Sequence, residues 1–344
     1  TESDPARCAE FLGALAGDLA GKPLLLPTRD HDVHFIIRYR EQLARDYLLA
    51  YPDSAVLAAI LDKSELARAA AAVDVHSPVS MEVACSADLE KLHGNISFPC
   101  IVKPVIASHW RRGEIRNIVQ RQKALRIESF AELQEIYQAI EAHDPRVTVQ
   151  EYIPGPESNL VIFGSYCDRD SRVKASFTAR KRLQYPATAG TGVVVEACPV
   201  PAIVAMSEQL LQAVGYVGMS EIEYKYDALR DRYVLIEINT RHWDQHGLGT
   251  AVGVNLSEVL YQDMLGGRPP TCQQSATPVC WLAEDGFLLS LIGNAKHRAY
   301  PWREYWDILR AKKSLAVFRW GDAKPALFLL RTIVADFFLR CARF

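Results

Sequence analysis

The sequence predicts an α/β protein in which an N-terminal unit with parallel strands precedes two mixed α+β lobes. Short apolar segments at 23–28 and 54–57 alternate with helical patterns over 8–20 and 38–50. Such alternation is typical of units in which a helix connects two parallel strands. Another helix is expected to begin at Asp62–Ser64, where either residue suits the N-cap.

From about residue 76 onward, β-rich segments dominate. Strands are predicted at 98–104, 147–153, 160–166, 173–178, 220–226 and 233–238. Amphipathic patterns over 129–142 and 201–214 predict helices, the first with Ser129 as N-cap and Glu132 completing a capping box. The chain beyond residue 270 has weaker patterning, although its aromatic side chains, among them Trp281, Trp302, Trp306, Phe318 and Trp320, suggest packing against the body or a second subunit.

Length and composition restrict the class of protein. At roughly 150 residues per domain, 344 residues indicate two or three domains. The net charge of −2 gives no sign of a nucleic-acid partner. Eight scattered cysteines without metal-binding spacing indicate reduced thiols and a cytoplasmic location.

The apolar tract 326–339 is broken by Arg331 and Asp336, so it is too short and too charged for a transmembrane segment. We interpret it as an amphipathic helix docked on the protein, with a helix on a membrane surface as the alternative.

Acidic and amide side chains recur on two predicted neighbouring strands. Glu237 and Asn239 are two residues apart and therefore share a face, and Glu223 lies on the preceding strand. Their oxygens are ligands of the kind that Mg2+ takes while bridging nucleotide phosphates. Arg241, on the same face, could hold a phosphate or carboxylate with two parallel hydrogen bonds. The alternative is an exposed hairpin with a polar face.

Three further features suit a nucleotide. Lys63 follows Asp62, and Lys103 ends an apolar strand, so both ammonium groups could meet phosphate. The segment 149–157 could offer backbone groups to an adenine edge and an acid to ribose hydroxyls. The alternatives are surface lysines and an ordinary strand followed by a Pro-Gly turn.

The motifs DK, FPxxVKP, QEYIPGxE, GYxGxxExE and IEINxR occur in this order. In this the chain resembles the ATP-grasp superfamily from about residue 22 to residue 268, and most of all its D-aspartate-ligase-like carboxylate–amine ligases. The segment 180–186, with the glycines that follow it, is also similar to that branch. The resemblance implies an ATP-grasp fold with a partial Rossmann-like N-terminal domain over 1–75, an N-lobe over 76–155, a C-lobe over 156–270 and an appendage over 271–344.

The resemblance also implies roles for matching residues. ATP phosphates would contact Lys63 and Lys103, and the transferred phosphate or acyl-phosphate would face Lys181 and Arg241. Adenine would be lined by Gln150, Glu151, Tyr152 and Ile153, and ribose would be held by Glu157. Magnesium would be held by Glu223, Glu237 and Asn239.

The activity implied is an ATP- and Mg2+-dependent ligase that joins a carboxylate, such as an amino acid, to an amine through an acyl-phosphate and releases ADP and phosphate. Small-molecule substrates and a homodimer are the expected partners. The segment 185–195 is expected to close as a lid. No general base is assigned, although His242, Asp244 and His246 follow Arg241.

Two departures from the family pattern keep alternatives open. The segment 105–114 has a single glycine, Gly113, and the bulky Trp110 where relatives place a Gly/Ser-rich loop, and a first strand and helix are expected before residue 8. The alternatives are a non-catalytic ATP-binding protein and a kinase that stops at phosphoryl transfer. A dinucleotide oxidoreductase is disfavoured, because no G-x-G-x-x-G follows a strand.

Overall fold

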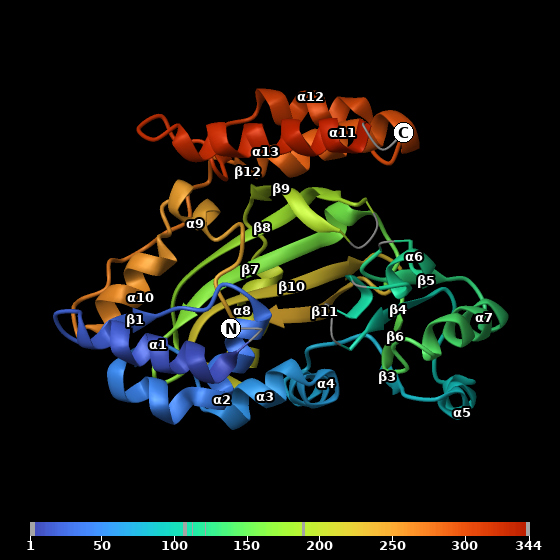
Figure 1. Ribbon diagram of the computed structural model, residues 1–344, viewed down its shortest axis with the longest axis horizontal. Helices are drawn as coiled ribbons and strands as arrows, with labels where there is room; N and C mark the ends of the chain where they lie inside the picture. Colours follow the sequence, from blue (N-terminus) through green and yellow to red (C-terminus); the bar gives the residue numbers. More distant parts are fainter. Residues whose placement is uncertain (1–3, 106–108, 112, 121, 188–189, 342–344) are drawn as a thin grey trace.

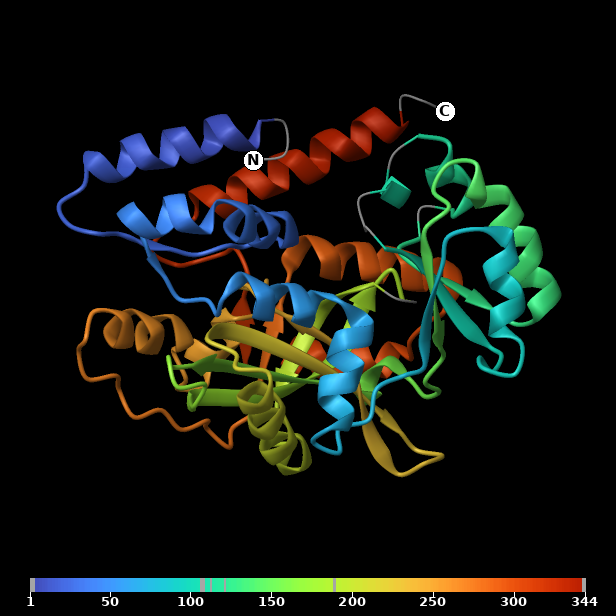
Figure 2. The same ribbon diagram turned by 90° about the horizontal axis from the view of Figure 1, so that it is seen from below.

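The computed structural model describes residues 4–105, 109–111, 113–120, 122–187 and 190–341. Three sheets organise these residues: a two-stranded parallel sheet, a four-stranded sheet and a seven-stranded sheet. Figure 1 shows the seven-stranded sheet at the centre, with the N-terminal helices on one side and a layer of C-terminal helices on the other. In Figure 2 the four-stranded lobe lies at one side of this sheet and α10 at the other.

The N-terminal unit comprises α1 (Pro5–Gly17), β1 (Leu24–Leu25), α2 (Asp30–Asp46), β2 (Leu48–Leu49), α3 (Ser54–Leu61) and α4 (Lys63–Ala71). β1 and β2 are parallel, as predicted. The strand predicted at 54–57 is wrong: its alanine-rich and leucine-rich sequence forms α3 instead. The helix predicted at 38–50 begins earlier, at Asp30, and the strand β2 directly follows its end.

The four-stranded sheet has the order β3–β6–β4–β5 and is antiparallel throughout. Its strands are β3 (Ser80–Val83), β4 (Cys100–Pro104), β5 (Leu125–Ile127) and β6 (Val147–Glu151). Alongside lie α5 (Ser86–Leu89), α6 (Ile115–Ile118) and α7 (Phe130–Glu141). Ser129 caps α7 by accepting a hydrogen bond from the Glu132 N–H at 3.2 Å. The Glu132 carboxylate accepts from the neighbouring Glu128 N–H, one residue outside the predicted capping box.

The seven-stranded sheet has the order β11–β10–β7–β8–β9–β12–β13. Its strands are β7 (Leu160–Cys167), β8 (Val173–Tyr185), β9 (Thr191–Ala197), β10 (Gly218–Asp227), β11 (Arg232–Asn239), β12 (Val279–Leu282) and β13 (Lys313–Leu315). Its associated helices include α8 (Pro201–Ala213), α9 (Gly247–Ala251) and α10 (Leu256–Met264). The sequence did not predict β9, and β8 continues beyond its predicted end to Tyr185.

The C-terminal part contains α11 (Glu284–His297), α12 (Trp302–Arg310) and α13 (Lys324–Cys341) around β12 and β13. Because both strands extend the large sheet, packing continues across position 270, where an appendage was expected to begin. The domain boundaries at 75, 155 and 270 stay predictions. The interpretation of 326–339 as a docked helix is wrong for its described side chains: Leu327 and Phe328 are 58% and 73% exposed. Within the described residues, no helix has the length and apolar character needed to cross a membrane.

One apolar core joins the N-terminal unit to the large sheet. Leu43 and Leu57 from the unit belong to the same buried cluster as Phe163 of β7. Contact is closest at Gly218, whose φ is +105° and where an added Cβ would lie 2.0 Å from the Ala50 carbonyl oxygen. Only glycine satisfies both conditions, so β10 is held directly against the N-terminal unit.

The N-cap of α4 allows a test of how this helix of the N-terminal unit is stabilised. Asp62 accepts hydrogen bonds from the Ser64 and Glu65 N–H groups at 2.8 and 2.9 Å. Asp62→Ala should lower the free energy of unfolding by about 1 kcal/mol, because two backbone donors lose their acceptor. Denaturant unfolding followed by circular dichroism measures this loss.

Asp53→Ala is the matched control, since Asp53 occupies the N-cap of α3 without a side-chain hydrogen bond to the helix. Equal losses in the two variants would contradict the capping role of Asp62.

Candidate functional site

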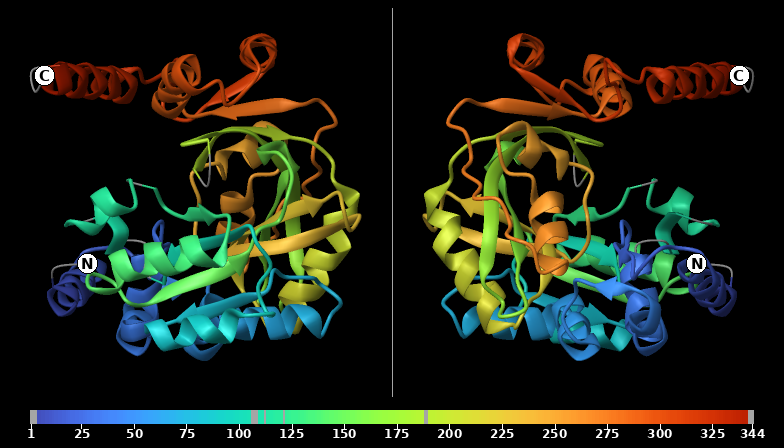
Figure 3. Two further views of the ribbon diagram at one scale, coloured as in Figure 1. Left: turned by 90° about the vertical axis from the view of Figure 1, so that its right-hand side faces the viewer. Right: turned by 90° about the vertical axis from the view of Figure 1, so that its left-hand side faces the viewer.

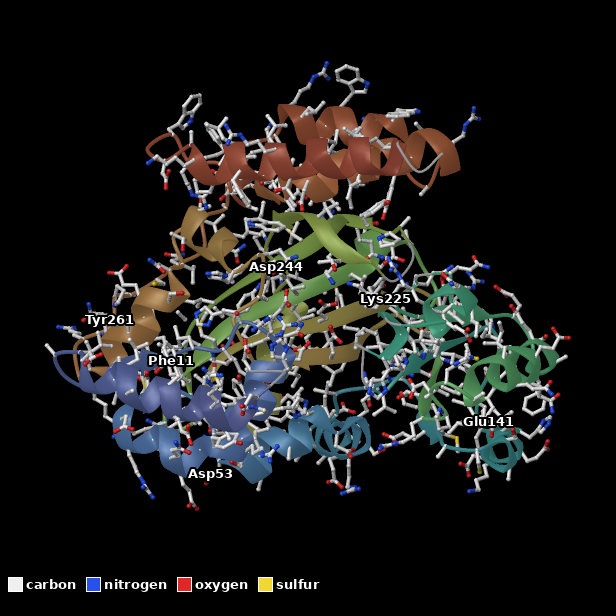
Figure 4. All side chains as sticks on the ribbon, viewed as in Figure 1. Phe11, Asp53, Glu141, Lys225, Asp244 and Tyr261 are labelled. Atoms are coloured by element: carbon white, nitrogen blue, oxygen red, sulfur yellow. The ribbon has the colours of Figure 1, made fainter. Side chains whose placement is uncertain are left out.

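A cavity of about 440 Å3 lies between the four-stranded and seven-stranded sheets. Figure 4 places Lys225, one lining residue, toward the four-stranded lobe and Asp244, another, toward the C-terminal helices. Of the residues predicted for the site, those that line the cavity are Lys103, Gln150, Glu151, Tyr152, Ile153, Glu157, Lys181, Glu223, Glu237, Asn239 and Arg241. Lys63 is outside the lining, but its charge acts on both Lys103 and Glu237.

Four polar side chains form a compact group on β10 and β11. Glu221 lies opposite Asn239, and Glu223 lies opposite Glu237 in the antiparallel register. Residues that are directly opposite, and residues two apart on one strand, share a face of the sheet. The Asn239 amide donates to a Glu221 oxygen at 2.9 Å and to a Glu237 oxygen at 3.5 Å. The strand register therefore gathers three carboxyl groups and one amide at the cavity.

Cations from other elements surround this group. Lys181 Nζ on β8 lies 2.7 Å from both carboxylate oxygens of Glu223. Arg241 donates to Asn239 Oδ1 at 3.3 Å and to Asp30 of α2 at 2.5 Å. On β4 the Lys103 ammonium donates to the Gln150 side chain. A metal ion at Glu223 would therefore compete with the Lys181 ammonium.

Burial and neighbouring charges divide the carboxyl groups into two kinds. Burial, followed by repulsion from Glu223, raises the pKa of Glu221 to about 8. Burial also favours the neutral form of Glu237, but Lys63, Lys103 and Lys181 outweigh it and lower the pKa of that carboxyl. At neutral pH, Glu221 is therefore mainly protonated while Glu237 is ionised.

The pKa of Lys103 is lowered, whereas that of Glu221 is raised. Burial and the neighbouring charge of Lys63 lower the pKa of Lys103 to about 7, although Glu237 opposes this shift. Two ammonium groups forced together in a buried place favour an anionic ligand, because such a ligand relieves their repulsion.

Sequence reasoning missed Glu221. Its signal was present, since Glu221 precedes Glu223 by two residues and must share its face of the strand. Glu221 Oε1 is buried and has no hydrogen-bond partner among the residues that the structure describes. This free oxygen, with Glu237 and the Asn239 amide, is a hard oxygen set that fits Mg2+.

A magnesium ion would need ligands from outside the chain as well. Within the described residues, no group of three or more His, Cys, Asp or Glu side chains is arranged to hold a metal ion. Mg2+ in nucleotide sites commonly takes only one or two carboxylates, with phosphate oxygens and water completing its octahedron. Magnesium binding by Glu223, Glu237 and Asn239 stays a prediction.

The residues predicted for adenine and ribose also line the cavity. The Tyr152 ring lies 4.5 Å from the Arg126 guanidinium and 5.2 Å from Lys225 Nζ. Glu151 forms an ion pair with Arg230 of the β10–β11 turn at 2.6 Å and accepts from the Val79 N–H at 3.3 Å, so its carboxylate links the four-stranded sheet to the seven-stranded sheet. Burial raises the pKa of Glu157, against the opposing charges of Lys225 and Lys181.

A hydrogen bond connects the two lobes at the cavity mouth. Lys123 Nζ, beside β5, donates to Thr191 Oγ1 at the start of β9 at 2.6 Å. Gly190 and Gly192, from the predicted lid, also line the cavity. Positions 188–189 of that lid lie outside the described residues. Closure of the segment stays a prediction.

Two other expectations have a structural outcome. Trp110, in the segment compared with a phosphate loop, is buried in the core of the four-stranded lobe, while positions 106–108 and 112 lie outside the described residues. Burial and then His246 lower the pKa of His242 to about 4, and this ring lies 3.3 Å from Ser257 Oγ. His242 is thus a neutral, packed side chain, whereas Asp244 does line the cavity.

Comparisons with known proteins found similar sequences and similar folds. Residues 194–262 match the family model for the carbamoyl-phosphate synthase L chain, ATP binding domain. The D-aspartate ligase of Enterococcus faecium is 24% identical over 262 residues, which cover 73% of this chain and 61% of that ligase. The chain therefore spans less than two thirds of this relative.

Solved structures show the same fold. The biotin carboxylase domain of Hydrogenobacter thermophilus 2-oxoglutarate carboxylase, solved with MgADP and bicarbonate, has a TM-score of 0.61 at 16% identity, covering 79% of this chain and 60% of that chain. The L-amino acid ligase of Bacillus licheniformis has a TM-score of 0.54 at 17% identity, covering 76% and 61%.

The fold is the ATP-grasp fold, as the sequence predicted, with the four-stranded and seven-stranded sheets as its two lobes. The resemblance to ATP-grasp carboxylate–amine ligases is confirmed by the sequence matches and the shared fold.

The raised pKa of Glu221 makes a prediction about stability. The unfolded chain ionises this carboxyl near its ordinary value, whereas the folded chain resists ionisation up to about pH 8. The contribution of Glu221 to the free energy of unfolding is therefore present at low pH and lost as the pH rises. The variant Glu221→Gln should not show this loss. We expect the variant to match the wild type near pH 4 and to exceed it at pH 8 by on the order of 2 kcal/mol.

Thermal unfolding at a series of pH values measures the difference. Glu208→Gln, at an exposed position on α8, is the control and should leave the pH profile unchanged. A Glu221→Gln profile parallel to that of the wild type would contradict the assigned protonation.

Proposed function

We propose that this protein is an ATP- and Mg2+-dependent ligase that joins a carboxylate to an amine through an acyl-phosphate. The observation that carries the proposal is the meeting of Lys103 and Lys181 with Glu223, Glu237 and Asn239 in one cavity between two lobes. Phosphoryl transfer from ATP needs cations that neutralise the phosphates and oxygens that hold a metal, and little else from the protein.

The site residues divide this work. Lys63 and Lys103 hold the phosphates of ATP, and bound Mg2+ supplies further neutralisation of their charge. Adenine lies against Tyr152 and Ile153, near Gln150 and Glu157. Glu223, Glu237 and Asn239 hold the metal, with Glu221 beside them.

The chemistry has two steps. A substrate carboxylate oxygen attacks the γ-phosphorus, so that an acyl-phosphate forms and ADP departs. The amine then attacks the acyl carbon, and phosphate leaves with the oxygen that came from the carboxylate. Arg241 and Lys181 stabilise the negative charge of the tetrahedral intermediate in this proposal. Closure of 185–195 would shield the acyl-phosphate from water.

Amino acids are the proposed substrates. The similar proteins include a D-aspartate ligase and an L-amino acid ligase, each named as a ligase that acts on an amino acid. A cytoplasmic location and a homodimer stay predictions.

The test is ADP release with Mg-ATP and pooled amino acids, followed by mass spectrometry of each active pool. A ligase yields ADP together with a new mass equal to two substrates less water. ADP with a phosphorylated mass alone would favour a kinase. ATP binding without ADP release in any pool would favour a non-catalytic ATP-binding protein.

Glu237 should matter for turnover more than for folding. Glu237→Gln removes a carboxylate charge that three lysines stabilise, and we expect ATP turnover to fall at least about 100-fold. The rate of ADP formation at saturating Mg-ATP measures this. Glu208→Gln is the matched control, and turnover within twofold of wild type for Glu237→Gln would remove Glu237 from the proposed metal site.

Lys103 should take up a proton when ATP binds. With its pKa lowered to about 7, Lys103 is mainly neutral at pH 8 in the free protein, and a bound triphosphate should restore its charge. We expect Lys103 to contribute an uptake of nearly one proton at pH 8 that disappears by pH 6. Calorimetric titration in buffers of different ionisation enthalpy measures it.

Lys103→Arg is the comparison, because arginine stays charged throughout this range. The uptake of the wild type minus that of Lys103→Arg isolates the contribution of Lys103. No difference between them at pH 8 would contradict a phosphate contact at this lysine.

A further inference from the structure

The C-terminal helix α12 has apolar side chains on two sides. Tyr305 and Ile308 are buried and belong to the apolar cluster beneath the helix. Trp302, Trp306 and Leu309, at positions i, i+4 and i+7, form a second stripe and are 50%, 60% and 48% exposed. Since the buried stripe already anchors α12, the outer stripe makes no contribution to the core.

Neighbouring elements add to this apolar surface. Exposed apolar side chains occur on α11 at Leu288, Leu289 and Ile292, on α13 at Leu327, Phe328 and Leu330, and between β13 and α13 at Trp320, which is 95% exposed. Figures 1 and 3 show α11, α12 and α13 together at one end of the molecule, with α13 projecting beyond the rest. Apolar groups gathered in this way mark an interaction surface.

The same region carries an excess of positive charge. Residues 284–341, from the start of α11 to the end of α13, contain ten basic and six acidic side chains, a net charge of +4, whereas the whole chain has −2 and its remainder therefore −6. Five of the basic residues are exposed and form no ion pair with a described residue: Arg298, Arg310, Lys312, Lys324 and Arg331. Cations and exposed tryptophans thus share one layer of an otherwise acidic protein.

We propose that this C-terminal layer, α11 to α13, lies on the surface of an anionic lipid bilayer. Tryptophan suits the boundary between headgroups and acyl chains, because its ring is apolar and its N–H is polar. Lysine and arginine contribute about 1 kcal/mol each near an anionic bilayer. The layer rests on the bilayer rather than crossing it, as amphipathic helices with a basic polar face do.

Charge favours a bilayer over a second copy of the chain. In a two-fold symmetric dimer the same surface occurs on both subunits. Pairing through this layer would therefore bring two surfaces of net charge +4 together, which like-charge repulsion opposes. An anionic bilayer matches both the charge and the aromatic side chains.

The test is co-sedimentation of the full chain with two kinds of vesicle. We expect binding to vesicles of phosphatidylcholine mixed with phosphatidylglycerol, and much weaker binding to vesicles of phosphatidylcholine alone. Raised salt should weaken the binding, because screening reduces the attraction. Arg310→Gln and Lys312→Gln should each weaken it about fivefold, the equivalent of about 1 kcal/mol per cation.

The paired change Trp306→Ser with Phe328→Ser tests the apolar contribution and should lower binding at least about tenfold. Leu229→Ser is the matched control, since Leu229 is 84% exposed in the β10–β11 turn and distant in sequence from this layer. Thermal unfolding of each variant checks that the fold is retained.

Three outcomes would overturn the proposal: no sedimentation with anionic vesicles, equal binding to both vesicle types, or a Leu229→Ser loss equal to that of the paired change. Self-association in sedimentation velocity that the paired change abolishes, without vesicle binding, would assign the layer to a second copy and also overturn it.

Discussion

Buried charge compensation is the interaction on which the rest of this structure depends. Three carboxyl groups lie together on two paired strands, with Glu221 and Glu223 buried and Glu237 partly buried. Such burial is costly unless opposite charges lie close by. Lys181 meets Glu223 at 2.7 Å, and the charge of Lys103 reaches Glu237 from the other lobe. The charge compensation is incomplete. Glu221 stays protonated, and its Oε1 has no hydrogen-bond partner among the described residues, so the site can accept a charged ligand.

The compensating cations come from three parts of the chain. Lys63 begins α4 in the N-terminal unit, Lys103 lies on β4 of the four-stranded lobe, and Lys181 lies on β8 of the large sheet. Arg241 is tied to Asp30 at the start of α2. The cluster can therefore form only when all three parts are packed together; a shared apolar core and the close approach at Gly218 hold two of them, the N-terminal unit and the large sheet, in contact. The packing of the three parts and the charge compensation at the cavity therefore depend on each other.

Local periodicity predicted much of the fold and most of the cavity lining. Glu237 and Asn239 could be assigned to one face because side chains on a strand alternate, and the ordered motifs led from there to the ATP-grasp fold. Prediction failed where long-range packing decides. Ser54–Leu57 forms a helix, and neither β9 nor the strands β12 and β13, which extend the large sheet, were predicted. Asp30 was missed because its role depends on Arg241, 211 positions away, whereas Glu221 was missed although its place two residues before Glu223 indicated it.

The central claim is that this cavity activates a carboxylate with ATP. The most direct measurement uses amino-acid substrates labelled with 18O in the carboxyl group, Mg-ATP and unlabelled water. If an acyl-phosphate forms and the amine attacks its carbon, one 18O atom should appear in the released inorganic phosphate. Inorganic phosphate without label, or label retained in a phosphorylated product, would contradict the account.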